Sequence, residues 1–347
     1  MKLASSLRLI AYLLGFGGAL LLTVLIVREG AAKIVAALAS ASWAFPAAVA
    51  ITLPRFLCDA AAWIALVPKE NRPSFCTAIW IRWVGGSVND LLPSARLGGD
   101  ILTARLATIS AGLTPGLAVG VAIVNTTVSV CLRIFVTAGC FVLIAGITGQ
   151  GRLYIPSLLA GLIALGAAAG IYTIQRFGFF RLAGELVSRV KFFAKWNSRL
   201  RGGAKFDEIL RALYSRRPAL LTYVLLWTAS WLIGCVETWI VLFALGIPIS
   251  FIAALIIETA GQGIRSLLFI VPAGLGVFEG GLLMICSLLG IPGDVALALA
   301  LIRRGREALF SAPGLIIWQF VEARRLLRRT GENERERAEA RGNAGSG

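Results

Sequence analysis

The chain has 347 residues, of which 58% are hydrophobic and only 15% are charged, with a formal net charge of +16 and no histidine. Soluble domains carry about 25% charged residues, so this composition excludes an ordinary soluble protein. The lack of histidine excludes Ser-His-Asp and Cys-His catalysis and most zinc sites. The six cysteines have no C-x-x-C spacing, so neither a redox motif nor a disulfide framework is indicated.

Apolar runs of the length that crosses a bilayer, about 20 helical residues, divide the chain into predicted elements. In chain order these are 7–27, 43–67, 75–92, 114–147, 154–174, 218–245, 250–271, 277–289 and 295–318. The segment 75–92 is short and contains two adjacent glycines, which is typical of a re-entrant segment. We therefore predict an all-α integral membrane protein, a polytopic helical bundle of about six to eight spans with two broken or re-entrant Pro/Gly segments, over residues 1–321.

Basic residues are concentrated between positions 175 and 217, where eleven Lys/Arg oppose three acidic residues. The positive-inside rule places this connector, and the Arg-rich flank at 324–329, in the cytoplasm together with both termini. Basic clusters beside membrane spans contact anionic lipid headgroups more often than nucleic acid, so no nucleic-acid partner is expected. The charged tail 322–347 has no apolar periodicity and is predicted to be disordered and cytoplasmic.

Two similar breaks interrupt the apolar pattern, one in each half of the chain. In each, two apolar residues precede a proline, glycines follow it, and an acid lies seven residues beyond it: Pro93 with Asp100, and Pro272 with Glu279. Unwound backbone at membrane depth is tolerated where it is buried in protein or lines a wet cavity. Paired broken helices indicate a central transport site. The alternative is that both breaks are turns, with the two acids as N-caps.

Charged residues also lie within or beside the apolar segments. They are Arg55, Arg82, Arg96, Arg105, Arg133, Arg265 and Arg306, with Asp59, Asp90, Asp100, Glu237, Glu258 and Glu279. A charge at the bilayer centre costs about 2.5–3.5 kcal/mol, so these side chains are expected to face the interior and pair. Arginine suits two-point recognition of phosphate. Structural ion pairs between helices are the alternative, and Arg55 with Asp59, at i, i+4 spacing, is the pair that best fits it.

The motifs together resemble a known family. They are Asn89 to Pro93 followed by Gly98-Gly99-Asp100 and Arg105, then 272–279 (PAGLGVFE), then Arg306 with Pro313-Gly314 seven residues later. Over about residues 5–320 this order resembles the flippase-like membrane region of lysylphosphatidylglycerol synthases and its stand-alone relatives, including a hopanoid-associated branch. The resemblance implies a multi-pass lipid-translocating protein of the bacterial inner membrane. It covers the membrane region alone, so the aminoacyl transfer of fused members is not implied.

From the motifs and the resemblance we expect a flippase that moves an anionic phospholipid, a polyprenyl phosphate or a hopanoid-type lipid, with no metal or cofactor. The expected substrate-binding residues are Asn89, Arg96, Gly98, Gly99, Asp100, Arg105, Arg265, Pro272, Gly274, Gly276, Glu279 and Arg306. The expected charge-balance or coupling residues are Asp59, Arg133, Glu237 and Glu258. Expected partners are membrane lipids with anionic headgroups and enzymes of lipid biosynthesis.

Two other classes of function remain open from the sequence. A membrane-embedded enzyme could modify a lipid headgroup with Asp100 and Glu279 as acid and base. However, the chain has no nucleophile motif, and Gly274-x-Gly276 follows a proline rather than a strand, unlike a nucleotide loop. A non-catalytic scaffold for enzymes of hopanoid or lipid biosynthesis could instead use the basic connector as its docking face. A scaffold is expected to survive neutralisation of the buried charges, whereas transport is not, so this change separates the two.

Overall fold

The computed structural model describes residues 20, 23–91, 97–148, 161–162, 165–166, 169–170, 173, 197–267 and 276–344. All the regular structure in these residues is helical. The helices are α2 (Ala31–Ser40), α3 (Ala44–Leu66), the short η1 (Lys69–Asn71), α4 (Phe75–Leu91), α5 (Leu97–Ala111), α6 (Pro115–Thr148), α9 (Asn197–Ser215), α10 (Arg217–Ala244), α11 (Phe251–Leu267), α12 (Val277–Leu288) and α13 (Gly293–Ala344). The elements predicted at 7–27 and 154–174 lie mostly outside the described residues.

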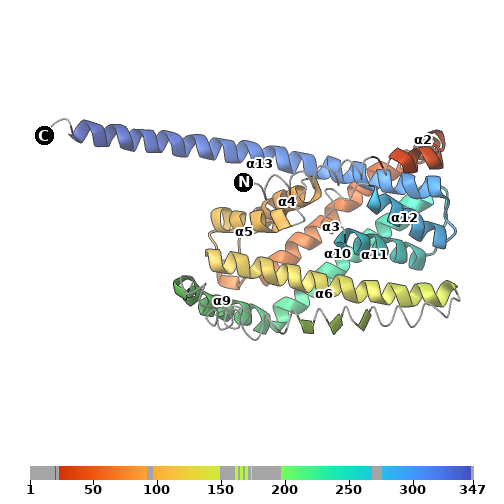
Figure 1. Cartoon of the computed structure of the whole chain (residues 1–347), viewed down its shortest axis with the longest axis horizontal. Helices are drawn as coiled ribbons and strands as arrows, with labels where there is room; N and C mark the ends of the chain where they lie inside the picture. The colour runs from red at the N-terminus through yellow and green to blue at the C-terminus, as the bar shows by residue number, and fades with distance from the viewer. Residues whose placement is uncertain are drawn as a thin grey trace.

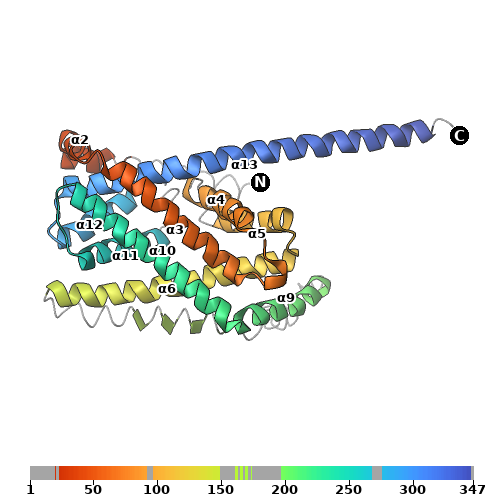
Figure 2. The same ribbon diagram turned by 180° about the vertical axis from the view of Figure 1, so that it is seen from behind.

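Helices α3 and α10 run side by side and are nearest the viewer in Figure 2, with α6 along one side and α13 along the other (Figures 1 and 2). Three described helices are long and apolar enough to cross a membrane, namely Ala44–Leu66, Pro115–Cys140 and Arg217–Ala244. The predicted membrane bundle is therefore confirmed as an all-helical fold with apolar spans. The count of six to eight spans stays a prediction.

Helices α4 and α5 pack against each other in opposite directions. The N–H of Gly99 donates to Asn89 Oδ1 at 2.9 Å, and a Cβ placed on Gly99 would collide with the carbonyl of Gly85. A Cβ on Gly85 would in turn collide with Thr103. The two glycines thus allow the two backbones to come into contact. Small residues at helix interfaces in membranes commonly permit such a close approach. At 17 and 15 residues, both helices are shorter than a full crossing.

Helices α11 and α12 are a second pair of short helices, of 17 and 12 residues. The segment before α11 and the segment after α12 enter the same apolar core, through Ile249 and Ile291. Helix α12 starts after Gly276, whose φ of 74° is a conformation that glycine adopts without steric cost. The expectation of two short, broken segments thus agrees with four helices that are each too short to span. Residues 92–96 and 268–275, which contain Pro93 and Pro272, lie outside the described residues.

Two apolar cores lie at opposite ends of the bundle. The first, here the connector-end core, includes Trp63 at the end of α3, Leu113 before α6 and Tyr223 near the start of α10. Helix α9, which belongs to the basic connector, joins this core through Leu210. The second, the opposite-end core, contains the start of α3, the end of α10 and the start of α13, with Phe278 fully buried in it. The middle of α3 and the middle of α10 therefore lie between two apolar layers.

Helix α13 continues far beyond the rest of the molecule and carries the C-terminus away from it (Figure 1). Its backbone is helical to Ala344, where the sequence predicted a disordered tail from 322. The tail is rich in Glu, Arg and Ala, which are good helix formers, and its opposite charges recur three and four residues apart. The prediction rested on the lack of apolar periodicity. That pattern indicates whether a helix is packed against other elements, but it does not measure the intrinsic helix propensity of the residues.

Candidate functional site

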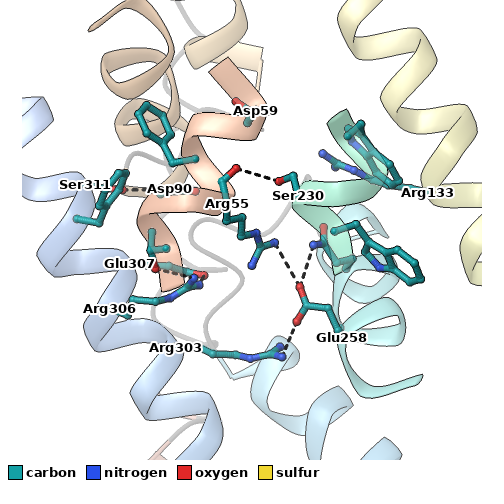
Figure 3. A pocket seen from close by; sticks show the side chains of 17 residues that line it. Arg55, Asp59, Asp90, Arg133, Ser230, Glu258, Arg303, Arg306, Glu307 and Ser311 are labelled. Atoms are coloured by element: carbon teal, nitrogen blue, oxygen red, sulfur yellow. Dashed lines mark hydrogen bonds and ion pairs between the residues drawn. The ribbon is translucent and has the colours of Figure 1, made fainter. Parts of the chain in front are cut away.

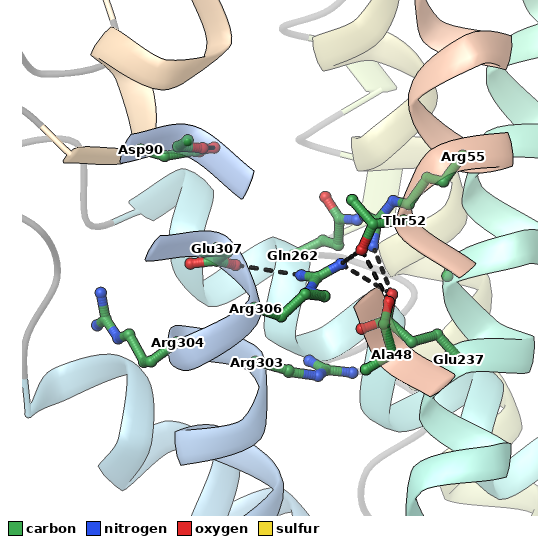
Figure 4. A network of polar contacts seen from close by, with 12 residues as sticks. Ala48, Thr52, Arg55, Asp90, Glu237, Gln262, Arg303, Arg304, Arg306 and Glu307 are labelled. Carbon is green, nitrogen blue, oxygen red and sulfur yellow. Dashed lines mark hydrogen bonds and ion pairs between the residues drawn. The ribbon is translucent and has the colours of Figure 1, made fainter. Parts of the chain in front are cut away.

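A network of buried ion pairs joins the helices in the layer between the two cores (Figure 4). Arg306 Nη1 on α13 lies 2.9 Å from Glu237 Oε2 on α10, and Arg303 Nη2 lies 2.6 Å from Glu258 Oε2 on α11. Arg55 on α3 contacts both acids, at 3.6 Å from Glu237 Oε2 and 3.3 Å from Glu258 Oε1. Each acid thus contacts two arginines, and the pairs join four helices.

Neutral side chains complete this network. Thr238 lies 2.5 Å from Arg303 Nη2 and donates to Glu258 Oε2 at 3.1 Å. Gln262 Nε2 donates to the other oxygen of Glu258 at 3.0 Å, and Arg306 Nη1 donates to Thr52 Oγ1 at 3.2 Å. Because buried charges are stable only when they are both paired and hydrogen-bonded, these contacts explain how the bundle holds the ions.

Helical spacing brings the network residues to one place. On α3, Ala48, Thr52, Arg55 and Asp59 recur three or four residues apart and so share one face. Gly234 on α10 provides the space, because a Cβ there would lie 2.9 Å from Glu258 Oε1 and 3.0 Å from Arg55 Nη1. The close approach of these charges therefore depends on a glycine.

A cavity of about 240 Å³ adjoins the network (Figure 3). Its charged lining consists of four arginines and four acids: Arg55, Arg133, Arg303, Arg306, Asp59, Asp90, Glu258 and Glu307. Ligand pockets typically measure 300–1,000 Å³, so this cavity has the size of a headgroup and not of a whole lipid. With all eight groups ionised the lining carries no net charge.

Buried hydrogen-bond donors at the cavity lack an acceptor among the residues that the structure describes. Arg306 Nε and Trp231 Nε1 belong to residues that line it, and both atoms are buried without a hydrogen-bond partner among the described residues. A buried donor without an acceptor costs about 1–3 kcal/mol. The site therefore favours a group rich in acceptor oxygens, and phosphate is such a group.

Helix α4 is tied to the cavity by two polar contacts. Arg82 donates to Asp59 Oδ2 through Nε at 2.9 Å and Nη2 at 2.7 Å. Ser311 on α13 donates to Asp90 Oδ2 at 2.9 Å. Asp59 thus pairs with Arg82, and the structure does not show the expected Arg55–Asp59 pair. The i, i+4 spacing brings two side chains within reach, but the neighbouring helices decide their partners.

The predicted residues around the first break lie outside the cavity lining. Asn89 on α4 and Gly99 on α5 hydrogen-bond to each other, and Gly98 stands next to Gly99 on α5. Asp100 Oδ2 accepts a hydrogen bond from Thr126 on α6 at 3.1 Å. Arg105 pairs with Glu322 on α13. These residues join helices or face a separate groove, whereas the cavity takes its arginines from α3, α6 and α13.

The remaining predicted residues, Arg96 and those around the second break, divide into two groups. Glu279 is buried on α12, and its Oε1 lies 2.8 Å from Arg304 Nε, while Gly276 forms the N-cap of α12. Arg96, Pro272 and Gly274 lie outside the described residues. Arg265 lies on α11, but its side chain is outside the described set. The structure therefore brings Arg133, Glu258 and Arg306 of the predicted set to the cavity, with Asp59 and, through its ion pairs, Glu237.

Arg303 is the functional candidate that the sequence did not select. Its side chain is 7% exposed and bridges α13 to α11 through Glu258. In the sequence it stands among four charged residues at 303–307, so charge alone does not separate it from its neighbours. Its three-residue spacing from Arg306 puts both on one helix face, and that spacing was the available signal.

Apolar helices long enough to cross a bilayer, together with a buried polar cavity between two apolar layers, define a helical membrane protein with a polar interior. The chain matches the family model described as the lysylphosphatidylglycerol synthase TM region over residues 8–314, and it belongs to that family. The predicted family is thus confirmed, and with it a membrane location and a lipid-related function. No curated protein and no solved structure matches the chain.

Proposed function

We propose that the protein is a flippase that moves a lipid with an anionic headgroup across the bacterial inner membrane. The observation that carries the proposal is the cavity lined by paired ions, with the unpaired donors Arg306 Nε and Trp231 Nε1, between two apolar cores. Polar groups at such a depth are costly and mark substrate pathways in membrane proteins. A lipid phosphate supplies acceptor oxygens for these donors and for the arginine forks.

The balanced charge of the lining suggests how the headgroup enters and leaves. A phosphate that binds Arg303 or Arg306 replaces a carboxylate as the partner of that arginine. The carboxylate concerned, Glu258 or Glu237, then keeps only Arg55 as a charged partner. Its buried charge is less well compensated, which is unfavourable until it binds a proton or regains its second arginine. Headgroup binding and loosening of the bundle are therefore coupled, and the resting pairs reform once the lipid leaves.

The two pairs of short helices support movement of the two halves. Helices α4 and α5 connect to the connector-end core, and α11 and α12 connect to the opposite-end core. Paired short helices that enter from opposite sides are a feature of transporters with inverted repeats, in which the site opens alternately to each side. The alternating opening of the site is inferred from analogy with such folds. An outward-open and an inward-open form with identical cavities would contradict it.

The charge distribution supports the orientation within the inner membrane. Helix α9 of the basic connector packs at the connector end, and Glu322, just before the Arg-rich flank, pairs with Arg105 of α5. Both basic segments therefore belong to the cytoplasmic side in this proposal, with both termini. The partners are anionic phospholipids, polyprenyl phosphates or hopanoid-type lipids and the enzymes that make them. The protein itself transports and does not catalyse a reaction.

A dithionite-quench assay tests the proposal. Purified protein in liposomes with fluorescent phosphatidylglycerol is expected to expose inner-leaflet lipid to dithionite. Arg306→Ala is expected to slow this at least tenfold, because Arg306 lines the cavity, and Arg211→Ala, at an exposed position on α9, is expected to leave it unchanged. Arg303→Lys keeps the charge but loses the two-point fork, so it separates phosphate recognition from folding. Wild-type rates equal to those of empty liposomes, for phosphatidylglycerol and for a polyprenyl phosphate, refute the proposal.

A further inference from the structure

A second, mostly apolar groove lies between α5 and α6, and its lining shares no residue with the cavity. It measures about 580 Å³, which is within the range of ligand pockets. Its apolar lining consists of Ile101, Ala104, Pro115, Val119, Ala122 and Ile123. The function proposed for the ion-lined cavity does not explain the presence of this apolar groove.

The groove opens on the outer face of the bundle. Ile101 is 70% exposed and Val119 is 43% exposed, and α6 is one of the helices long enough to cross a membrane. In a bilayer such a face contacts lipid chains, which are as apolar as the side chains themselves. The hydrophobic effect alone therefore does not hold a lipid chain in the groove. The position of such a chain depends on its packing against the groove and on where the lipid headgroup is bound.

Polar residues connect the groove to the cavity. Asp100 lines the groove from α5, which packs against α4, and Arg82 of α4 binds Asp59 at the cavity. On α6, Thr126 lines the groove and Arg133 lines the cavity, seven residues or about 10 Å further along the helix. The two spaces are thus separated by less than the length of a lipid.

We propose that the groove binds an acyl chain of the phospholipid whose headgroup enters the cavity. The inference rests on the proposed function and adds the part of the substrate that it leaves open, the hydrocarbon chain. The bilayer that faces the groove consists of acyl chains, so such a chain can enter sideways without leaving the membrane. Arg105, with half of its side chain exposed at the groove, is placed to contact the glycerol-phosphate region as the headgroup moves inward.

Filling the groove tests the proposal. Ala122→Trp places an indole in it, whereas Val130→Trp adds the same bulk at an exposed position of α6 outside its lining. Ala122→Trp is expected to slow translocation of long-chain phosphatidylglycerol at least tenfold, and Val130→Trp to stay within twofold of wild type. Ala104→Leu fills less of the groove and is expected to give an intermediate rate. Wild-type rates in both groove variants overturn the proposal.

A direct reading of the groove uses phosphatidylglycerol with a photoreactive diazirine on one acyl chain. Labelling of unaltered protein is expected at residues 101–123 and is expected to be lost in Ala122→Trp but kept in Val130→Trp. Label spread evenly over all exposed apolar faces overturns the proposal, as does labelling of the groove by a polyprenyl diazirine phosphate alone. If wild type labels at the groove but does not translocate lipid, the proposed transport fails and the chain site stands.

Discussion

Glu258 binds two arginines, Arg55 and Arg303, and it also accepts hydrogen bonds from Thr238 and Gln262. In Glu258→Gln the shape of the side chain remains but its charge is lost, so both arginines lose a partner in the buried layer. Removing one partner of a buried ion pair costs about 3–5 kcal/mol. We therefore expect the free energy of unfolding to fall by that amount.

The size of the loss separates two explanations. Hydrogen bonds between membrane helices contribute about 0.6 kcal/mol on average, so a loss below about 1 kcal/mol means that the amide replaces the carboxylate and the charge matters little. The assay is SDS-induced unfolding in mixed micelles, followed by circular dichroism. Glu322→Gln is the matched control, because its partner Arg105 is half-exposed and exposed pairs contribute about 0–1 kcal/mol.

A second substitution tests whether the uncompensated charge causes the loss. Adding Arg303→Gln to Glu258→Gln removes a positive charge from the same layer, so the double variant is expected to regain part of the stability. Equal unfolding curves for wild type, Glu258→Gln and Glu322→Gln would refute the reasoning. A double variant whose losses simply add would show that the two residues do not interact.

Three other expectations follow from close packing and exposure. Gly234→Ala introduces a Cβ against the ion network and is expected to cost about 1–3 kcal/mol, whereas Gly139→Ala meets no atom within 4 Å and is expected to gain about 0.5–1 kcal/mol in the same unfolding assay. On α4, Gly85→Ala is expected to separate α4 from α5 and lower stability, while its neighbour Gly86→Ala meets nothing within 4 Å and is expected not to. Cys76 is exposed at the start of α4, so in a variant without the other cysteines a membrane-impermeant maleimide is expected to label it from the cytoplasmic side only.

Each of these has a clear opposite outcome. Equal stabilities within either glycine pair would mean that the helices adjust to a methyl group and that close approach is not required. Labelling of Cys76 in intact spheroplasts would place the connector end outside the cell and reverse the proposed orientation.

The sequence predicted the helical bundle well because apolar length is a local property. It also indicated the short segments on either side of Pro93 and Pro272, since proline and glycine act on the backbone directly. The partners of the charged residues were less accessible. Asp59 pairs with Arg82 from the next helix, and nothing in the local spacing around it predicts that contact.

The sequence indicated the kind of chemistry at the candidate site better than it indicated which residues line the cavity. Burial of arginines and acids within apolar segments indicated a polar interior, and Glu258 and Arg306 do line the cavity. Asn89 and Gly99 instead join two helices, because a pattern of small and polar residues fits a close helix contact as well as it fits a ligand. Arg303 could be selected only with knowledge of which face of α13 packs towards α11.

The length of α13 has a mechanical consequence. Its 52 residues measure about 78 Å at 1.5 Å per residue, more than twice the roughly 30 Å thickness of the hydrocarbon core. The helix that supplies Arg303 and Arg306 to the cavity therefore also has a long C-terminal arm that projects from the bundle. Pro313 lies between the two parts and leaves the carbonyl of Leu309 without its usual helical donor, so it is the natural pivot. A bend of α13 at this position would move Ser311, which donates to Asp90 at the wall of the cavity.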